Sequence, residues 1–357
     1  MRVWAVCPVS AAIWRSIYRI QCGPGIRHRL GLVLHLQSMH SKTATDSEAA
    51  KWFHRCLGPL PLRESIRVES QDIDNVGPWN VERLQFRCGA QDPVTAVLVR
   101  PEGIDHPPVV IAHHGYGEGK DIFMFGRYSG YKWVRQPGAA NLVSSGLAVL
   151  GIDAHGHGPR LKDAPDRSMD KDAWQDAFVR NWEWFARKCI IRGVAVQGLL
   201  IHDVQCAIDY LESRGDVDAS RLGMYGYSMG GTTCWSTTVI EPRIKAAVAG
   251  GCMINYETAL RVRRDASWHA WVPALCQRTS REALVASIAP RPLLAVHGED
   301  DFPYEGVAPI LDAASAEYNQ CGCPELFRSV FLPGDHTAAA DNPRLVDETG
   351  CWLAKHL

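Results

Sequence analysis

Short aliphatic runs alternate with longer, more polar stretches along the chain from residue 81 onward. Eight of these runs have the length and composition of strands, and they are Val81–Cys88, Val94–Val99, Val109–His113, Leu147–Asp153, Arg221–Tyr225, Ile244–Ala249, Pro292–His297 and Leu326–Leu332. The first two are close enough in sequence to form an antiparallel hairpin. Helical stretches separate the later ones, which predicts an α/β fold with a mostly parallel, doubly wound sheet of eight strands. In such sheets, binding and catalytic sites form at the carboxyl ends of the strands.

The clearest helix precedes the fifth strand. Its apolar residues recur at helical spacing from Val194 to Leu211, and the pattern ends at Ser213–Gly215 with a basic residue and a glycine. The fifth strand follows, and a second helix is expected from Gly230 onward. The sequence Gly226-Tyr227-Ser228-Met229-Gly230 therefore lies where a strand turns into a helix.

This pentapeptide fits a nucleophile elbow, in which small residues stand two positions before and two after a serine. A strand that turns sharply into a helix leaves no room for a side chain at those two positions, and the turn exposes the central hydroxyl. Ser228 is therefore the candidate nucleophile. Because a serine hydroxyl is a poor nucleophile at neutral pH, it needs a histidine base within hydrogen-bond reach and a carboxylate that orients the base.

The segments after the last two predicted strands supply both groups. A glycine turn, Gly298-Glu299-Asp300-Asp301, follows one strand, and Pro333-Gly334-Asp335-His336 follows the other. We take Asp301 as the acid because of its spacing from the glycine, with Asp300 as a competing choice, and His336 as the base. The competing interpretations are a solvated turn aspartate and an ordinary loop histidine.

The negative charge that develops on the substrate oxygen needs two fixed N–H donors. Met229 should supply one, because it follows the nucleophile at the start of a helix. Tyr116 should supply the other, from the glycine-rich loop after the strand Val109–His113. His113 and His114 could instead be metal ligands, but no acidic or histidine partner accompanies them at ligand spacing, so no metal is expected.

These segments together resemble the α/β-hydrolase superfamily, and more narrowly its dienelactone hydrolase and acetyl-xylan-esterase-like branch. The resemblance covers about residues 80–357 and rests on the segments His114–Tyr116, Asp153–Gly158, Asp203–Gly231, Ile288–Leu294, Gly298–Pro303 and Gly334–His336. It implies a serine carboxylesterase that works through an acyl-enzyme without a cofactor. Dienelactone hydrolases use a cysteine nucleophile where this chain has Ser228, which favours an ordinary ester over a lactone.

We expect a single domain over residues 46–357, with insertions over the site near residues 159–188 and 256–284. Both insertions are rich in aromatic residues, which should chiefly pack a Trp-rich helical cap onto the domain. Tyr227, beside the nucleophile, and Trp182 and Trp268, from the two insertions, are the candidates for substrate contact.

Composition excludes several other classes of protein. The chain has 357 residues and a formal net charge of -1, and no basic stripe points to a nucleic-acid partner. The sequence contains no run of eighteen uncharged apolar residues, so no membrane span is predicted. The twelve cysteines are scattered, several in apolar contexts, which is typical of buried free thiols.

Residues 1–45 differ from the rest, because they contain arginine and lysine but no aspartate or glutamate. This composition is typical of an organelle transit peptide, and an upstream-extended reading frame with its true start at Met39 would look the same. The protein is otherwise expected in the cytoplasm, and a homo-oligomer is an open alternative to a monomer.

The expected activity is hydrolysis of a small-molecule carboxylic ester. A peptidase, an acyltransferase and a catalytically inactive binding protein are alternatives on the same fold. The peptidase is less favoured, because about 80 residues before the core cannot form the several four-stranded blades of a gating propeller. The inactive protein is less favoured because a nucleophile, a base and an acid can all be assigned in order.

Overall fold

The computed structural model describes residues 47–76, 79–89, 92–117, 119–125, 138–161, 171–262 and 267–357. By its contacts the chain divides into two units, residues 1–41 and 42–357, and every described residue belongs to the second. The basic segment 1–45 lies outside the described residues. No described helix is long and apolar enough to cross a membrane.

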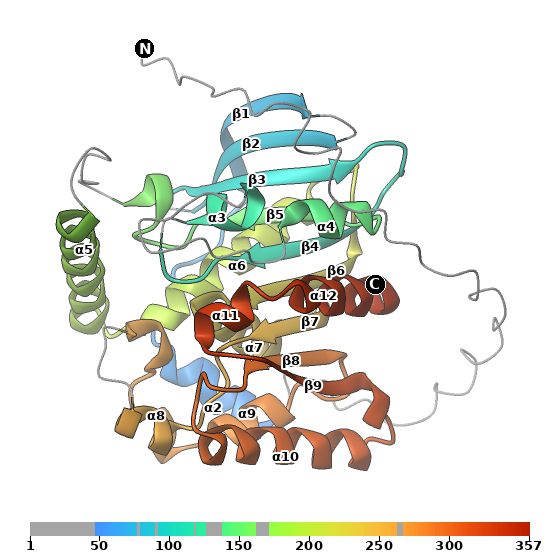
Figure 1. Ribbon diagram of the computed structural model, residues 1–357. Coiled ribbons are helices and arrows are strands. Elements are labelled where there is room, and N and C mark those ends of the chain that lie inside the picture. Colours follow the sequence, from blue (N-terminus) through green and yellow to red (C-terminus); the bar gives the residue numbers. More distant parts are fainter. Residues whose placement is uncertain are drawn as a thin grey trace, which may run out of the picture. The chain divides into compact units, whose positions relative to one another are not determined.

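Within the described residues, nine strands form one sheet in the order β1-β2-β3-β5-β4-β6-β7-β8-β9 (Figure 1). The strands from β5 to β9 in this order run parallel, and β3, β2 and β1 extend the sheet by antiparallel pairing. Their bounds are β1 Ile66–Val76, β2 Trp79–Cys88, β3 Val94–Pro101, β4 Pro108–His113, β5 Ala148–Ile152, β6 Asp218–Tyr227, β7 Ile244–Gly250, β8 Leu293–Gly298 and β9 Phe327–Leu332. The mostly parallel α/β sheet is confirmed, and so is the expected antiparallel hairpin, which β2 and β3 form.

The expected number of strands was wrong, because the sheet has nine strands instead of eight. The additional strand, β1, pairs with β2 from Ile66↔Cys88 to Val76↔Trp79. It lies at the edge of the sheet, and its apolar Val68 and Ile73 are 44% and 60% exposed. Charged and polar residues are typical of edge strands, and they hide the alternation that marks a buried strand.

Helices cover both faces of this sheet (Figure 1). The described helices are α2 Glu48–Cys56, α3 Lys120–Phe125, α4 Ala139–Ser144, α5 Lys171–Ile191, α6 Val196–Glu212, α7 Met229–Ile240, α8 Tyr256–Val262, α9 Arg281–Ala286, α10 Tyr304–Gln320, α11 His336–Ala340 and α12 Pro343–His356. One apolar core joins α2, α6, α7, α9 and α10 to one face, and a second joins α3, α4, α11 and α12 to the other. In β4, Ile111 belongs to the first core and Val110 to the second, as expected for a strand buried on both sides.

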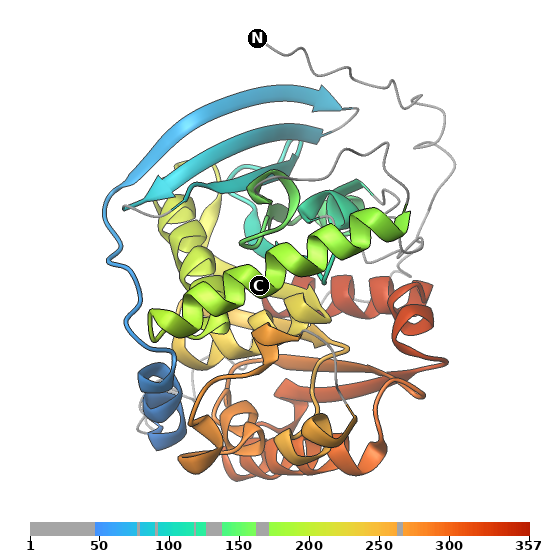
Figure 2. The same cartoon turned by 90° about the vertical axis from the view of Figure 1, so that its left-hand side faces the viewer.

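The first expected insertion contains α5, a helix of 21 residues that continues three residues beyond the expected boundary, to Ile191. Figure 2 shows α5 running diagonally in front of the sheet. Its buried Trp182, Ala186 and Cys189 form a small apolar cluster with Val196 and Leu200 of α6 and with Met229 of α7. Helix α5 and Met229, the first residue of the helix that follows Ser228, therefore share one apolar cluster.

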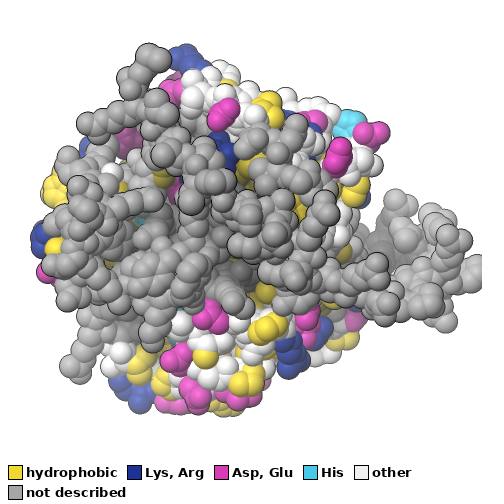
Figure 3. All heavy atoms as spheres, turned by 45° about the horizontal axis from the view of Figure 1, so that its top comes forward, with side chains coloured by type: hydrophobic (Ala, Val, Ile, Leu, Met, Phe, Trp, Pro, Cys, Tyr) yellow, Lys and Arg dark blue, Asp and Glu magenta, His cyan; other side chains and the backbone are white. Residues whose placement is uncertain are grey.

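The second expected insertion contains α8, a 3-10 turn at Trp268–Ala270, another at Leu275–Gln277 and the start of α9. The Trp268 side chain packs against the same small cluster as Trp182. On the face drawn in Figure 3, the basic and acidic side chains of the described residues are interspersed. This distribution agrees with the small net charge of the chain.

Candidate active site

Ser228 lies between the last residue of β6 and the first residue of α7. Its backbone has φ 61° and ψ −122°, a strained conformation that a non-glycine residue rarely adopts. A Cβ atom on Gly226 would overlap the backbone of Gly230, and one on Gly230 would overlap the carbonyl of His113. The flanking glycines are therefore required by close backbone approaches, as the sequence pattern predicts. The Ser228 side chain is only partly buried.

The carboxyl ends of the parallel strands bring distant segments of the chain together. Strand β8 pairs with β9 so that Gly298 lies opposite Leu332. Asp301 follows three residues after Gly298, and His336 follows four residues after Leu332. Asp301 Oδ2 lies 2.7 Å from His336 Nδ1, and the aspartate side chain is only 4% exposed while that of the histidine is 35% exposed.

Asp300 occupies a different environment from Asp301. It is exposed, and its N–H donates to the carbonyl of Gly334 at 3.0 Å. The N–H of the neighbouring Glu299 donates to Leu332 O at 2.8 Å. These bonds hold the loop after β8 against the loop after β9, and they leave the carboxylate of Asp301 as the one that meets the imidazole.

Tyr227 and Gly251 fix the position of His336 from the other side. The Tyr227 hydroxyl donates to the backbone carbonyl of His336 at 2.9 Å. Gly251 has φ +58°, and a Cβ atom there would lie 2.7 Å from Tyr227 Cε1 and 3.0 Å from His336 Cε1. The preceding residue, Gly250, accepts the N–H of Ser228 at 2.8 Å. The end of β7 therefore touches both the serine and the histidine segments.

Tyr227 was a candidate for substrate contact, and the structure places it beneath the site. Its side chain is buried, with 1% of the residue exposed. Burial raises the pKa of its phenol, and the nearby carboxylate of Asp301 acts in the same direction, so the hydroxyl stays neutral and can donate. In this arrangement Tyr227 positions the His336 backbone.

The two proposed oxyanion donors belong to adjacent strand ends. His113 at the end of β4 pairs with Gly226 in β6, so the loop carrying Tyr116 lies beside the elbow carrying Met229. His114 holds that loop, because its Nδ1 lies 2.6 Å from Gly115 O and its Nε2 accepts the N–H of Ala154 at 2.9 Å. Both nitrogens of His114 are thus occupied by backbone groups, which disfavours the metal-ligand interpretation of this residue.

Three buried histidines surround this loop. Burial lowers the pKa of His113 to about 4 and that of His157 to about 3, and it lowers the pKa of His114 in the same way. All three are therefore neutral imidazoles at neutral pH. Their Nδ1 atoms lie within hydrogen-bond distance of backbone carbonyls at His114, His155 and Gly115. This set of contacts is structural, and it makes the loops after β4 and β5 one rigid unit.

Aromatic side chains from α5 back the Tyr116 loop. The Tyr116 ring meets those of Phe178 and Trp182 edge to face, at centroid separations of 4.7 and 5.8 Å. Trp182 has no exposed surface, whereas Trp268 is partly buried. In this structure Trp182 is thus a packing residue behind Tyr116. Trp268 instead lines a largely apolar cavity of about 580 Å³ between α8 and the start of α6.

Two buried ion pairs near the site were not expected from the sequence. Lys120 Nζ lies 2.5 Å from Asp153 Oδ2, and Arg160 Nη1 lies 2.5 Å from Asp203 Oδ2. Asp203 lies within the apolar pattern of the predicted helix, and a charged residue among buried positions is the signal that could have identified it. Its partner, 43 residues earlier in the chain, carries no comparable signal.

The sheet order, the strained serine at the end of β6 and the Asp301–His336 pair define the chain as an α/β-hydrolase. The family model for acetyl xylan esterase (AXE1) matches residues 62–269, more than half of the chain, so this protein belongs to that family. The resemblance expected from the sequence is thereby confirmed. The matched segment includes Ser228 and Tyr116 but ends before Asp301 and His336, whose pairing rests on the structure alone.

Individual proteins also resemble this chain. The Bacillus subtilis protein named "Putative hydrolase YtaP" is 28% identical over 300 residues, which cover 82% of this chain and 95% of that protein. A solved structure titled as a putative acetyl xylan esterase from Bacteroides fragilis has a TM-score of 0.62 at 16% identity, covering 80% of this chain and 73% of that one. A promiscuous CE15 esterase from a marine bacterial metagenome has a TM-score of 0.60 at 16% identity, covering 87% and 90%. At these identities the two structures show the fold.

Proposed function

We propose that this protein hydrolyses carboxylic esters through a covalent acyl-enzyme on Ser228. The observation that carries the proposal is the contact between Asp301 and His336, at the same edge of the sheet as a serine held at positive φ. Acetyl esters of carbohydrates are the first substrates to test, since the chain belongs to the acetyl xylan esterase family.

The chemistry follows from the roles of these groups. His336 Nδ1 donates to Asp301, which leaves Nε2 to accept the proton from Ser228 Oγ as the oxygen attacks the ester carbonyl. The N–H groups of Tyr116 and Met229 stabilise the oxyanion of the tetrahedral intermediate. Protonated His336 then gives its proton to the departing alkoxide, which leaves as the alcohol. Water repeats the sequence on the acyl-enzyme and releases the acid.

The test compares the wild type with Ser228→Ala and His336→Ala, using a fluorophosphonate probe and p-nitrophenyl esters of increasing acyl length. We expect labelling and turnover in the wild type only, with each variant retaining its fold by circular dichroism. A folded wild type that takes no label would favour the inactive binding protein instead. Labelling without ester turnover, together with amide cleavage or transfer to an added alcohol, would favour the peptidase or the acyltransferase.

A further inference from the structure

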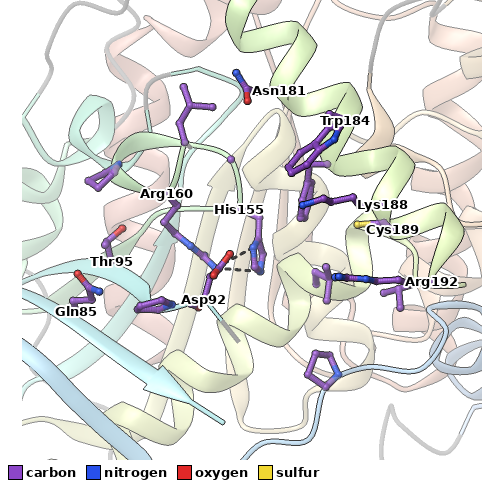
Figure 4. A pocket seen from close by; sticks show the side chains of 18 of the residues that line it. Gln85, Asp92, Thr95, His155, Arg160, Asn181, Trp184, Lys188, Cys189 and Arg192 are labelled. Carbon is purple, nitrogen blue, oxygen red and sulfur yellow. Dashed lines mark hydrogen bonds between the residues drawn. The ribbon is translucent and has the colours of Figure 1, made fainter. Parts of the chain in front are cut away.

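A second cavity, of about 520 Å³, lies beside α5, and none of the proposed catalytic residues lines it (Figure 4). Its walls come from β2 and β3, the loop after β5, and the last turns of α5. Trp182 points toward Tyr116, whereas Phe185 and Lys188 of the same helix, with Arg192 just after its last residue, face the cavity. At 3.6 residues per turn, these two sets lie on adjacent faces of α5. The cavity is therefore separated from the Tyr116 loop by the buried layer that contains Trp182.

The floor of the cavity is a fixed group of buried charges. Arg160 Nη1 lies 2.5 Å from Asp203 Oδ2 and donates to Asp153 O at 2.8 Å, and its Nη2 lies 3.1 Å from the ring nitrogens of His155. The side chain of Arg160 is only 4% exposed and that of Asp203 only 2% exposed. Figure 4 shows Arg160 and His155 directed toward each other across the floor. Such a network presents its polar edge in one fixed orientation.

The wall formed by α5 adds two cations. The ammonium of Lys188 lies 3.2 Å from the centroid of the Trp184 ring, which holds it by a cation–π contact. Among the described residues, no carboxylate lies within ion-pair distance of Lys188 or Arg192. With Arg160, three cations line the cavity against the carboxylates of Asp92 in the wall and Asp203 behind the floor. Among the described residues that line or back the cavity, the cations thus exceed the carboxylates by one.

The rest of the lining combines polar side chains, those of Gln85, Thr95 and Asn181, with apolar and aromatic ones. The Phe185 ring stacks on the His155 imidazole with a centroid separation of 5.2 Å and an interplanar angle of 15°. Burial raises the pKa of the Cys189 thiol to about 11, so this group adds no negative charge at neutral pH. The volume lies within the range of small-molecule pockets, about 300–1,000 Å³. The cavity thus combines a positive wall with aromatic faces.

We propose that this cavity binds a small organic carboxylate with a planar, apolar body, separately from the catalytic site. Guanidinium and ammonium groups favour carboxylates, for which Arg192 offers a planar pair of donors. The Phe185 and Trp184 rings provide the surface for the apolar body. Cations at the end of a helix also favour its dipole whether or not a ligand binds, so the experiment must separate these two roles.

Isothermal titration calorimetry with benzoate, cinnamate and 2-naphthoate, each beside its neutral amide, tests the proposal. We expect each carboxylate to bind at least about tenfold more tightly than its amide, as a charge-assisted hydrogen bond predicts. The double variant Lys188→Gln/Arg192→Gln should weaken carboxylate binding by about tenfold or more. The matched control is Arg187→Gln, on the same helix but paired with Glu183 and 65% exposed, and it should leave binding unchanged.

The location is tested with protein whose Ser228 has reacted with a fluorophosphonate. This labelled protein should bind the carboxylates as tightly as the unlabelled protein, and the double variant should retain wild-type hydrolysis of p-nitrophenyl acetate, which also reports its folding. Equal binding of acid and amide, unchanged binding by the double variant, or loss of binding on labelling would overturn the proposal. Inorganic phosphate that binds as tightly as the aromatic acids would refute the carboxylate class.

Discussion

Replacing Arg160 by methionine tests the buried charge network directly. The substitution keeps much of the apolar side chain and removes the guanidinium that lies 2.5 Å from Asp203. Asp203 then remains buried, with His155 Nε2 at 3.2 Å as its nearest ion-pair partner. Removing one member of a buried pair typically costs about 3–5 kcal/mol, because the other charge stays out of water. We expect Arg160→Met to lower the free energy of unfolding by about that amount near neutral pH.

The pH dependence of this loss has a definite sign. In the wild type, burial raises the pKa of Asp203, but Arg160 and His155 outweigh burial and hold the pKa below its ordinary range. The pair then stabilises the protein above the unfolded aspartate pKa of about 3.9, and this stabilisation is lost as the pH falls through lower values. In Arg160→Met, burial becomes the stronger effect and raises the pKa of Asp203 above about 3.9. Proton uptake by Asp203 on folding then stabilises the variant. The difference in free energy of unfolding between the wild type and Arg160→Met should therefore become smaller as the pH falls from about 7.5 to about 5.5.

Urea unfolding at both pH values measures the effect, with the variant Arg160→Met/Asp203→Asn as the matched control. Removing both charges should recover at least about 2 kcal/mol and flatten the pH dependence, since no buried carboxylate remains. The exposed Arg192→Met should change stability by less than about 0.5 kcal/mol. A loss below about 1 kcal/mol for Arg160→Met near neutral pH, or an equal loss at both pH values, would refute the reasoning.

Three further predictions concern the candidate active site. Asp301→Asn should lower kcat for p-nitrophenyl acetate by about 10³–10⁴-fold while Asp300→Asn leaves it unchanged, and equal effects of the two would contradict the assignment of the acid. Gly251→Ala should lower kcat by about 10²-fold, because a Cβ atom there displaces His336; a kcat within about twofold of wild type would show that the site tolerates the shift. Trp182→Ala should lower the free energy of unfolding by about 3–5 kcal/mol in urea titrations, and a smaller loss would show that the Trp182 site is not tightly packed.

The sequence predicts those parts of the fold in which local pattern and final position coincide. The central strands are buried on both faces, so their aliphatic runs are continuous and visible. Helix α6 is confirmed because most of its apolar residues face the first core at helical spacing, and it ends at Glu212 beside the expected stop. The elbow is visible in the sequence because a Cβ atom on either glycine would overlap backbone atoms. On Gly226 it would meet Gly230, and on Gly230 it would meet the end of β4. Strand β1 is missed because, as an edge strand with polar and exposed positions, it shows no apolar alternation.

The candidate site depends on the choice between neighbouring residues, which a one-dimensional pattern does not resolve. Asp300 and Asp301 have the same chemistry and differ only in direction, which the hydrogen bonds between the loops after β8 and β9 determine. Tyr227 was a candidate for substrate contact, and in the structure its hydroxyl is directed toward the His336 backbone carbonyl. Side-chain direction at a strained turn is set by tertiary contacts, so these roles follow only from the folded chain.

The sequence does not reveal how the side chains of α5 are distributed between the Tyr116 loop and the cavity. The aromatic residues of this helix were expected to form a cap, and they contribute to two adjoining environments. Trp182 and Phe178 contact Tyr116, whose N–H is a proposed oxyanion donor. Phe185 and Lys188 line the cationic cavity. One helix therefore carries both the aromatic layer behind the proposed oxyanion donor and a wall of the cavity, an arrangement that only the folded chain reveals.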